Sequence, residues 1–379
     1  MTVGVAVLGS TGSIGCSTLK VLDRHRDRFR VVALTAYSNA DLLDQQARRW
    51  DPQYVGLVNG TTRNAQRATG RGGSGTKCLV EAVTHPDVRI VVNGVVGAAG
   101  LEATLAALGA GKRVALANKE TLVMAGELVT RTARAGGGEI VPVDSEHSAV
   151  LQCITGHGPT DVARLILTAS GGPFRTWEPD RVAAATVDEA LRHPTWKMGK
   201  KISVDSATLV NKALEVIEAH FLFGLPYDAV EVVVHPQSVV HAFVEFVDRS
   251  VLAQVGFPTM ELPILYALTH PERVPDGGSP RFDPVAAGSL TFEVVRPDTF
   301  PAYGVGRAAA DAGGTAPAVF NAANEVAVGL FLDGRIPFGR IAATLARVMD
   351  RHRAERAESL EAVLAADAMG RRLALEAAC

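Results

Sequence analysis

The sequence predicts an α/β protein with a doubly wound parallel sheet, an α+β middle domain and a small helical bundle at its C-terminus. Three observations support this. The chain opens with a strand, a glycine-rich turn and a helix; strands and helices then alternate as far as residue 144; and the pattern is helical from Ala302 onward. We expect a Rossmann-like domain at residues 1–145, a middle domain at 146–270, a linker at 271–298 and a helical domain at 299–379.

The composition excludes several classes of protein. A chain of 379 residues that is 47% hydrophobic is long enough for roughly two or three domains. Its net charge of −2 favours neither nucleic acid nor an anionic membrane as a partner. The four cysteines are scattered without a CxxC pair, which fits a reducing cytosol. There is neither a signal peptide nor an apolar run of roughly 20 residues, so we expect a cytoplasmic protein.

The first element is a strand at residues 3–8, followed by GSTGSIG at 9–15 and an amphipathic helix. Gly9 permits a tight turn, Gly12 lets the backbone approach a pyrophosphate, and Gly15 allows close packing of the helix. The start of the helix adds free N–H groups and the positive end of its dipole. This order favours nucleotide binding. The alternative is a tight turn that binds nothing.

The second strand, residues 30–36, ends without the acidic residue that usually binds the ribose of NAD, since no acid occurs before Asp41. Ser38 and Asn39 can instead hydrogen-bond a 2′-phosphate, which favours NADP. Further strands are expected at 54–58, at 113–120 and at 139–144, with a flexible surface loop at 70–76. Residues 89–100 are expected to form a strand that runs into a glycine-rich turn and a helix.

Polar residues gather where these strands end, at the edge of a parallel sheet where ligands bind. Asn118 and Lys119 follow one strand, and Asp144, Ser145 and Glu146 follow another. In an extended backbone Asp144 and Glu146 would point the same way and suit a hard divalent cation such as Mg²⁺ or Mn²⁺. The alternative is a helix start with Asp144 or Ser145 as its N-cap.

Residues 193–220 are the most informative stretch. A loop with a basic, flexible hinge at Gly199 is expected to lead into one helix, with Asp205 or Ser206 as N-cap. Asn211 and Glu215 are four residues apart on that helix, with Lys212 beside them, so they share a face suited to a phosphorylated, metal-bound ligand. From the helix alone, a solvated polar face is the simpler interpretation.

The remaining segments comprise one candidate anion site and several structural elements. Ser170 opens a glycine turn, SGGP, whose backbone N–H groups suit an anion, although an ordinary turn is the alternative. Residues 231–257 predict antiparallel strands, and the histidines there, His235 and His241, are expected to be structural. Residues 275–280 and 282–289 indicate a linker.

Several long, ordered motifs resemble the 1-deoxy-D-xylulose 5-phosphate reductoisomerase family over nearly the whole chain. They are GSTGSIG (9–15), NGVVGAAGL (93–101), ALANKE (115–120), VDSEHSA (143–149), SGGPF (170–174), HPTWKMGKKISVDSATLVNKALEVIEA (193–219), HPQSVVHAFVEF (235–246) and NAANEVAV (321–328). The resemblance implies an NADPH-dependent enzyme of the non-mevalonate isoprenoid pathway. It would rearrange 1-deoxy-D-xylulose 5-phosphate and reduce it to 2-C-methyl-D-erythritol 4-phosphate. It also implies a homodimer.

The resemblance also assigns roles. One divalent cation (Mg²⁺, Mn²⁺ or Co²⁺) would be held by Asp144, Glu146 and Glu215, which form the catalytic set together with Lys119 and His193. Besides Glu146 and Glu215, the substrate-binding residues would be Ser145, Ser170, His193, Trp196, Ser206, Asn211 and Lys212, with residues 191–201 as a mobile lid. NADPH would be bound by Thr11, Gly12, Ser13, Ile14, Ser38, Asn39, Asn118, Lys119, Glu120, Met198 and Gly199.

Two positions depart from the family. Tyr37 stands where many members have glycine, beside the expected ribose site, and Glu261 stands where members commonly have arginine, a change of charge expected near the middle domain. Two other functions are alternatives, and the first needs the same glycine turn, acids and lysine. A metal-assisted NADP-dependent sugar-phosphate dehydrogenase would not rearrange its substrate. A non-catalytic NADP-binding sensor would not need the three acids together.

Overall fold

The computed structural model describes residues 2–60, 72–158 and 160–378, and the chain forms two compact units. The first unit contains Met1–Thr121, Val129–Ser148 and Thr259–Pro280, and the second contains Leu122–Leu128, Ala149–Pro258 and Arg281–Cys379. This division differs from the expected domains, because residues 259–280 return to the N-terminal unit and the C-terminal helices share a unit with the middle of the chain.

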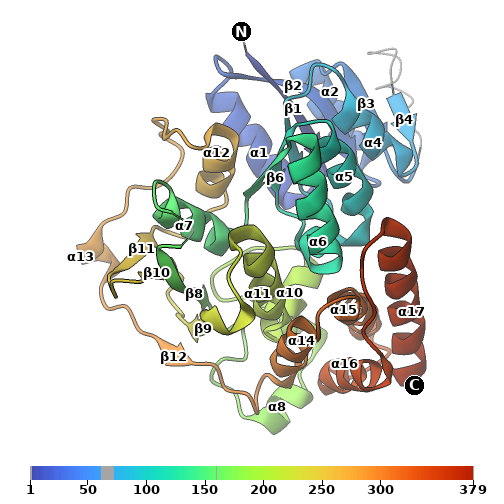
Figure 1. Cartoon of the computed structure of the whole chain (residues 1–379), viewed down its shortest axis with the longest axis vertical. Helices are drawn as coiled ribbons and strands as arrows, with labels where there is room; N and C mark the ends of the chain where they lie inside the picture. The colour runs from blue at the N-terminus through green and yellow to red at the C-terminus, as the bar shows by residue number, and fades with distance from the viewer. Residues whose placement is uncertain (1, 61–71, 159, 379) are drawn as a thin grey trace. The chain divides into compact units, whose positions relative to one another are not determined.

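The first unit is built on a seven-stranded sheet in the order β4-β3-β2-β1-β5-β6-β7, and each neighbouring pair is parallel (Figure 1). The predicted doubly wound sheet is confirmed. The strand order reverses between β1 and β5, and ligands of such sheets bind at this reversal, beyond the carboxyl ends of the strands. The elements are β1 (Val3–Leu8), α1 (Ser13–Arg24), β2 (Phe29–Ala36), α2 (Ala40–Trp50), β3 (Tyr54–Leu57), β4 (Gly72–Ser74), α4 (Lys77–Thr84), β5 (Ile90–Asn93), η1 (Gly97–Gly100), α5 (Leu101–Gly109), β6 (Arg113–Leu116), α6 (Lys119–Gly136), β7 (Glu139–Pro142), α7 (Ser145–Ile154) and α12 (Glu261–Thr269).

Part of the segment predicted as a flexible loop is a strand. Gly72–Ser74 form β4 and pair in parallel with β3, while residues 70 and 71 of that predicted loop lie outside the described residues. A Cβ atom on Gly73 would lie 2.2 Å from the Tyr54 hydroxyl oxygen. The glycine is therefore explained by close packing at this sheet edge and not by flexibility.

Helix α12 joins the first unit through its contacts with α1. Arg24, in the last turn of α1, makes an ion pair with Glu261 (Nη1–Oε2, 2.8 Å) and a bidentate pair with Asp276 (2.7 and 3.0 Å). The family departure at Glu261 therefore places its charge in the N-terminal unit, and the expectation that it lies near the middle domain is wrong.

The second unit contains a five-stranded sheet in the order β11-β10-β8-β9-β12. The predicted antiparallel pairing is confirmed for β10 with β11, but β9 runs parallel to its neighbour β8. Four α-helices and the 3-10 helix η2 connect β8 to β9, and such a long crossover allows parallel pairing. The elements are β8 (Val162–Ala169), α8 (Pro179–Ala183), α9 (Val187–Leu191), α10 (Lys200–Ala207), α11 (Val210–Phe223), η2 (Tyr227–Ala229), β9 (Val230–Val234), β10 (Val240–Phe246), β11 (Val251–Val255), α13 (Pro284–Ala287), β12 (Glu293–Val294), α14 (Pro301–Ala312), α15 (Ala316–Leu332), α16 (Gly339–Arg351) and α17 (Leu360–Ala378).

The predicted C-terminal helices are confirmed as α14 to α17, which pack on one another and are coloured orange to red in Figure 1. The expected linker contains the short elements α13 and β12. His235 is structural as expected, because its Nε2 accepts the N–H groups of Val239 and Val240, both at 3.1 Å. Within the described part of the chain, no helix combines the length and apolar character that crossing a bilayer requires.

Candidate active site

The glycine turn between β1 and α1 has the geometry that the sequence predicts. Gly9 has a φ of +72°, and the Gly12 N–H donates to the Gly9 carbonyl over 3.0 Å. A Cβ atom on Gly15 would lie 2.3 Å from that same carbonyl oxygen, so only glycine lets α1 approach the turn. Gly12 is the N-cap of α1 and makes no side-chain cap. Ser13 begins the helix, and the backbone N–H groups of its first turn are thus available to bind an anion.

A buried pair of hydrogen bonds holds this turn against α2. Ser10 Oγ donates to Gln46 Oε1 over 2.7 Å, and Gln46 Nε2 donates to the Ser10 carbonyl over 2.9 Å. The sequence reasoning missed this pair, since 36 residues separate the partners and neither belongs to a recognisable motif.

The end of β2 carries the residues expected near a 2′-phosphate. Tyr37 is 66% exposed, and Ser38 follows it on the surface. Asn39 is the N-cap of α2, and its Oδ1 accepts the Leu42 N–H over 3.2 Å. This hydrogen bond uses the Oδ1 acceptor of the Asn39 side chain. The Nδ2 group of the same side chain points in another direction and takes no part in the cap.

Asn118 is buried and fixes the start of α6 to the loop after β5. Its Oδ1 accepts the Thr121 N–H over 3.2 Å, and its Nδ2 donates to the carbonyls of Val95 (2.8 Å) and Gly97 (3.0 Å) and to Glu120 Oε2 (3.0 Å). Both amide hydrogens are therefore engaged inside the protein. The structure thus gives the Asn118 side chain a framework role at the sheet edge.

Asp144 and Glu146 lie at the start of α7, with Lys119 beside them. The Lys119 ammonium makes an ion pair with Asp144 Oδ2, and both side chains are largely buried. The Glu146 N–H donates to Asp144 Oδ1 over 3.1 Å, and Ser145 Oγ donates to Glu146 Oε2 over 3.0 Å. The extended backbone expected here is wrong, and the alternative of a helix start capped by Asp144 is correct. The positive end of the helix dipole stabilises both carboxylates.

His147 belongs to the same sequence cluster as Asp144 and Glu146, but the sequence pattern assigned it no role. The ring is fully buried, and its Nδ1 lies 3.8 Å from Asp144 Oδ1. The signal was present, because residues three apart at a helix start share a face. A buried imidazole beside a carboxylate restricts how that carboxylate turns.

Residues 193–220 form two helices and not one. Asp205 and Ser206 lie inside α10, so the prediction that either caps a helix is wrong. The break comes at Leu209, which has a φ of +57° and precedes α11. A leucine is strained in this left-handed region, and burial of its side chain, which is 2% exposed, compensates for that strain.

The polar face of α11 is buried, so the solvated-face alternative is wrong. Lys212 is 6% exposed and Glu215 is fully buried. Lys212 Nζ lies 2.5 Å from Glu215 Oε2, and Asn211 Nδ2 donates to Glu215 Oε1 over 2.5 Å. Buried ion pairs contribute little to stability, because desolvation of the charges offsets their attraction. A functional site is therefore the better explanation for this one.

His193 connects the loop before α10 to the glycine turn after β8. Its Nδ1 accepts two backbone N–H groups, from Thr195 (3.1 Å) and Trp196 (2.8 Å). The ring proton is therefore on Nε2, which lies 2.8 Å from Ser170 Oγ and donates to it. Burial, and secondly the Lys212 charge, lowers the pKa of His193 from 6.5 to about 4. His193 is thus a neutral hydrogen-bond donor near pH 7.

Ser170 is oriented by its two neighbours. Its Oγ accepts the His193 Nε2–H and also the Gly172 N–H, at 3.2 Å. Gly171 and Gly172 have φ values of +80° and +64°, which form the predicted turn. Because both acceptor positions of the Ser170 hydroxyl are used, its own proton points away from them toward a further acceptor.

The loop expected as a lid is shorter than predicted, because Leu191 ends α9 and Lys200 and Lys201 begin α10. Trp196 lies beside the His241 ring, with 6.4 Å between centroids. Gly199 is the N-cap of α10 with a φ of −64°, which any residue adopts, and a Cβ there would meet nothing within 4 Å. The Gly199 backbone therefore does not require glycine, unlike that of Gly9.

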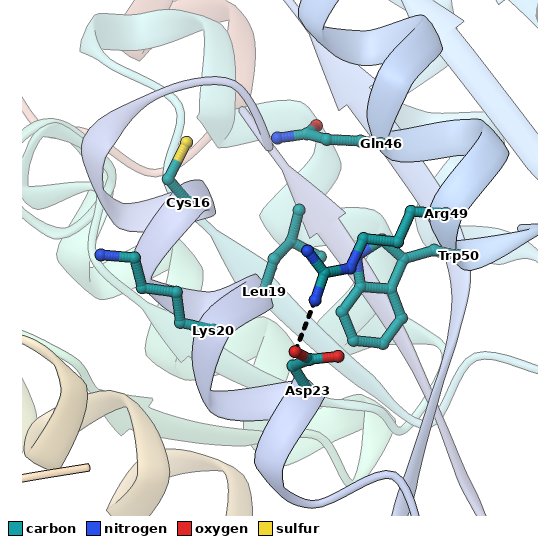
Figure 2. A pocket seen from close by; sticks show the side chains of 7 residues that line it. All are labelled: Cys16, Leu19, Lys20, Asp23, Gln46, Arg49 and Trp50. Atoms are coloured by element: carbon teal, nitrogen blue, oxygen red, sulfur yellow. Dashed lines mark hydrogen bonds and ion pairs between the residues drawn. The ribbon is translucent and has the colours of Figure 1, made fainter.

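A separate pocket of about 190 Å³ lies between α1 and α2 (Figure 2). The Asp23–Arg49 ion pair (2.5 Å) lines this pocket beside the Trp50 ring. None of the candidate site residues lines it. Its lining residues are Cys16, Leu19, Lys20, Asp23, Gln46, Arg49 and Trp50.

Comparison with known proteins agrees with these features. Residues 5–126 match the family model for 1-deoxy-D-xylulose 5-phosphate reductoisomerase, residues 140–223 match that of its C-terminal domain, and residues 255–373 match a DXP reductoisomerase C-terminal domain. Among curated relatives, the 1-deoxy-D-xylulose 5-phosphate reductoisomerase of Symbiobacterium thermophilum is 51% identical over 99% of both chains. That of Geotalea uraniireducens is 49% identical over 97% of this chain and 96% of its own.

Solved structures match equally well. The Zymomonas mobilis 1-deoxy-D-xylulose 5-phosphate reductoisomerase in complex with NADPH is 41% identical, with a TM-score of 0.93 over 100% of this chain and 99% of that one. A DOX-P reductoisomerase in complex with NADPH, fosmidomycin and magnesium is 40% identical, with a TM-score of 0.92 over 99% of this chain and 98% of that one.

Proposed function

The chain belongs to the 1-deoxy-D-xylulose 5-phosphate reductoisomerase family, and from this premise we propose that Asp144, Glu146 and Glu215 hold the divalent cation of its reaction. The enzyme rearranges 1-deoxy-D-xylulose 5-phosphate and reduces it with NADPH to 2-C-methyl-D-erythritol 4-phosphate, in the non-mevalonate isoprenoid pathway. The observation that most supports the proposed site is the buried Lys212–Glu215 pair on α11.

The chemistry of the three acids fits such an ion. Carboxylate oxygens are the donors that Mg²⁺ and Mn²⁺ prefer. Lys119 makes an ion pair with Asp144 and Lys212 makes one with Glu215, so each of these two acids has a positive neighbour that balances its charge. When bound, the ion stabilises negative charge that develops on the substrate oxygens during the skeleton rearrangement.

The phosphate end of the substrate is assigned to the second unit. We place it at Ser170, Ser206, Asn211 and Lys212. The Ser170 hydroxyl proton is free for a phosphate oxygen because His193 and Gly172 use its acceptor positions. Lys212 supplies positive charge, and binding the remote phosphate orients the reacting carbons.

The cofactor is assigned to the edge of the seven-stranded sheet. The α1 N-terminus at Thr11, Gly12, Ser13 and Ile14 would hold the pyrophosphate. Ser38 and the Asn39 amide would hold the 2′-phosphate. At the nicotinamide end we place Lys119, Glu120, Met198 and Gly199, with Asn118 acting through the loop that it fixes. NADPH supplies the hydride, and the protein positions it.

Two groups would act on the substrate besides the acids. Lys119 orients Asp144 and offers N–H donors to a substrate oxygen. The His193–Trp196 segment would cover the substrate and exclude water, which protects the aldehyde that is reduced last. His193 contributes here as the acceptor that folds this segment and as the donor to Ser170, not as a general acid or base.

We further propose a cytoplasmic homodimer. Cys16, Cys78 and Cys153 are thiols that form no disulfide with one another, which fits a reducing compartment. A second copy would cover the face of the five-stranded sheet where Ile166 and Phe243 are half-buried, beside Phe292, which is 45% exposed. Sedimentation at micromolar concentration tests this, and a monomer would refute it.

A turnover assay tests the function. Protein, 1-deoxy-D-xylulose 5-phosphate, NADPH and Mg²⁺ are mixed, and nicotinamide absorbance is followed with and without a chelator. We expect metal-dependent oxidation of NADPH with 2-C-methyl-D-erythritol 4-phosphate as product. An unbranched polyol phosphate would indicate a dehydrogenase without rearrangement, and NADPH binding without turnover would indicate a sensor.

A further inference from the structure

The NAAN motif on α15 has a contact that the proposed chemistry does not use. Asn324 is fully buried, and its Nδ2 donates to Asp205 Oδ1 over 2.7 Å. Asp205 is 1% exposed and lies on α10, where Lys201 Nζ is 2.9 Å from its other oxygen. A buried amide–carboxylate bond thus joins the C-terminal helices to α10, across 119 residues of sequence.

The orientation of the Asn324 amide is fixed by charge. Turning the amide over would place its Oδ1 against the Asp205 carboxylate, which is repulsive. In the orientation observed, Asn324 Oδ1 is buried and has no hydrogen-bond partner among the described residues. A buried acceptor left without a partner is unfavourable, so the bond to Asp205 is the interaction that determines this side chain.

Helix α10 needs an external anchor because its own sequence stabilises it poorly. It has eight residues, fewer than the roughly 12 that an isolated helix needs. Lys200 and Lys201 occupy its first turn, against the positive end of the helix dipole, and Asp205 lies toward its negative end. Lysine four residues before an acid is also the weaker order for a helical ion pair.

The position of α10 matters for the substrate. Its N-cap, Gly199, ends the loop that His193 begins, and Ser206 near its C-terminus is a proposed phosphate ligand. A Cβ atom on Gly172 would lie 2.7 Å from the Ser206 carbonyl oxygen, so α10 also packs directly on the turn that presents Ser170. A shift of α10 would therefore displace Ser206 and the end of the loop together.

We propose that Asp205 and Asn324 are positioning residues through which the C-terminal helical bundle holds α10 in place for sugar-phosphate binding. Neither residue touches the substrate in this scheme. The inference rests on the proposed function of Ser206. It predicts that a defect in the bundle contact weakens sugar-phosphate binding more than NADPH binding, since of the proposed NADPH contacts only Met198 and Gly199 adjoin α10.

The test compares Asn324→Leu with a matched variant, Asp367→Asn. Asp367 is a buried acid of the bundle that pairs with Arg371 (2.7 and 3.0 Å) on its own helix, α17. We expect Asn324→Leu to raise the KM for 1-deoxy-D-xylulose 5-phosphate about 10-fold, with a smaller rise in the Kd for NADPH. Asp367→Asn should lower Tm without changing that KM. Equal KM changes in both variants would overturn the proposal.

A second readout does not depend on turnover. Hydrogen exchange of amides 199–207 should become faster in Asn324→Leu and stay unchanged in Asp367→Asn. If the wild type lacked turnover, the proposed function would fail, whereas unchanged exchange in Asn324→Leu would refute the anchoring role itself.

Should Asn324→Leu not fold, an exchange of the two partners replaces it. Asn324→Asp alone places two carboxylates together and should impair sugar-phosphate binding. Adding Asp205→Asn restores an amide–carboxylate pair with its roles reversed, and we expect it to recover most of the lost affinity. A double variant no better than Asn324→Asp would contradict the inference.

Discussion

His193 gives the sharpest test of the site, because its two ring nitrogens have different tasks. Asparagine at this position can present its Oδ1 near the location of Nδ1, so His193→Asn keeps the acceptor for Thr195 and Trp196 but loses the donor to Ser170. His193→Gln has the opposite effect, since its Nε2 reaches toward Ser170 while the acceptor is lost.

The magnitude follows from the bonds removed. His193→Gln leaves two backbone N–H groups of the loop without their acceptor, at distances that are now 3.1 and 2.8 Å. At about 1 kcal/mol for each hydrogen bond the loss is about 2 kcal/mol, or roughly 30-fold in the population of the folded loop. His193→Asn loses one bond, to Ser170, which corresponds to about 1 kcal/mol or roughly 5-fold.

The assay is kcat/KM for 1-deoxy-D-xylulose 5-phosphate at saturating NADPH, with the Kd for NADPH as control. We expect NADPH binding to change less than kcat/KM in both variants, and His193→Gln to lose more activity than His193→Asn. If His193→Gln were the more active of the two, folding of the loop by Nδ1 would not be the main role of this residue, and the assigned tautomer would be wrong.

Three further outcomes are expected. First, the pKa of His193 lies below its unfolded value, so the contribution of this residue to stability is present above pH 6.5 and is lost as pH falls toward 4. NMR should therefore show no titration of the ring between about pH 5.5 and 8. A titration midpoint near pH 6.5 would contradict this expectation. Second, Glu215→Gln leaves the Lys212 charge buried without its partner, which lowers the stability of the folded protein by about 3–5 kcal/mol. The variant should lose turnover, while calorimetry should still detect NADPH binding. Near-normal turnover would show that Glu215 is not part of the site. Third, Gly15→Ala should weaken NADPH binding and lower Tm, because its Cβ would lie 2.3 Å from the Gly9 carbonyl oxygen. Gly12→Ala is the control, since the nearest contact of its Cβ is 3.3 Å, and it should keep the wild-type Tm. Equal losses of Tm in the two variants would contradict the packing argument.

The fold could be predicted where local patterns and backbone rules determine it. The seven-stranded sheet follows from buried strands that alternate with helices, and the turn at Gly9 and Gly15 has the conformation and packing that the motif requires. Sequence patterns were less informative where long-range packing decides. Strand β4 depends on the contact of Gly73 with Tyr54, and the break between α10 and α11 depends on burial of Leu209. Neither contact is visible in a local window.

The candidate site shows the same limit. Spacing placed Asn211 and Glu215 on one face, which is confirmed, but it could not show that the face is buried. Asp144 was expected at the end of an extended strand. In the structure it caps α7, because its Oδ1 accepts a hydrogen bond from the Glu146 N–H. The Asn324–Asp205 bond was not predicted, because no local pattern connects partners 119 residues apart.

The return of residues 259–280 to the N-terminal unit has a consequence for biosynthesis. The first unit is discontinuous, and α12 buries Ile264, Leu265 and Leu268 in it while Arg24 binds Glu261 and Asp276. A ribosome that has made only the first 150 residues has therefore supplied the seven strands without the helix that covers part of α1. The nucleotide-binding half of this enzyme can be completed only after most of the chain has emerged, so its final packing step is late in synthesis.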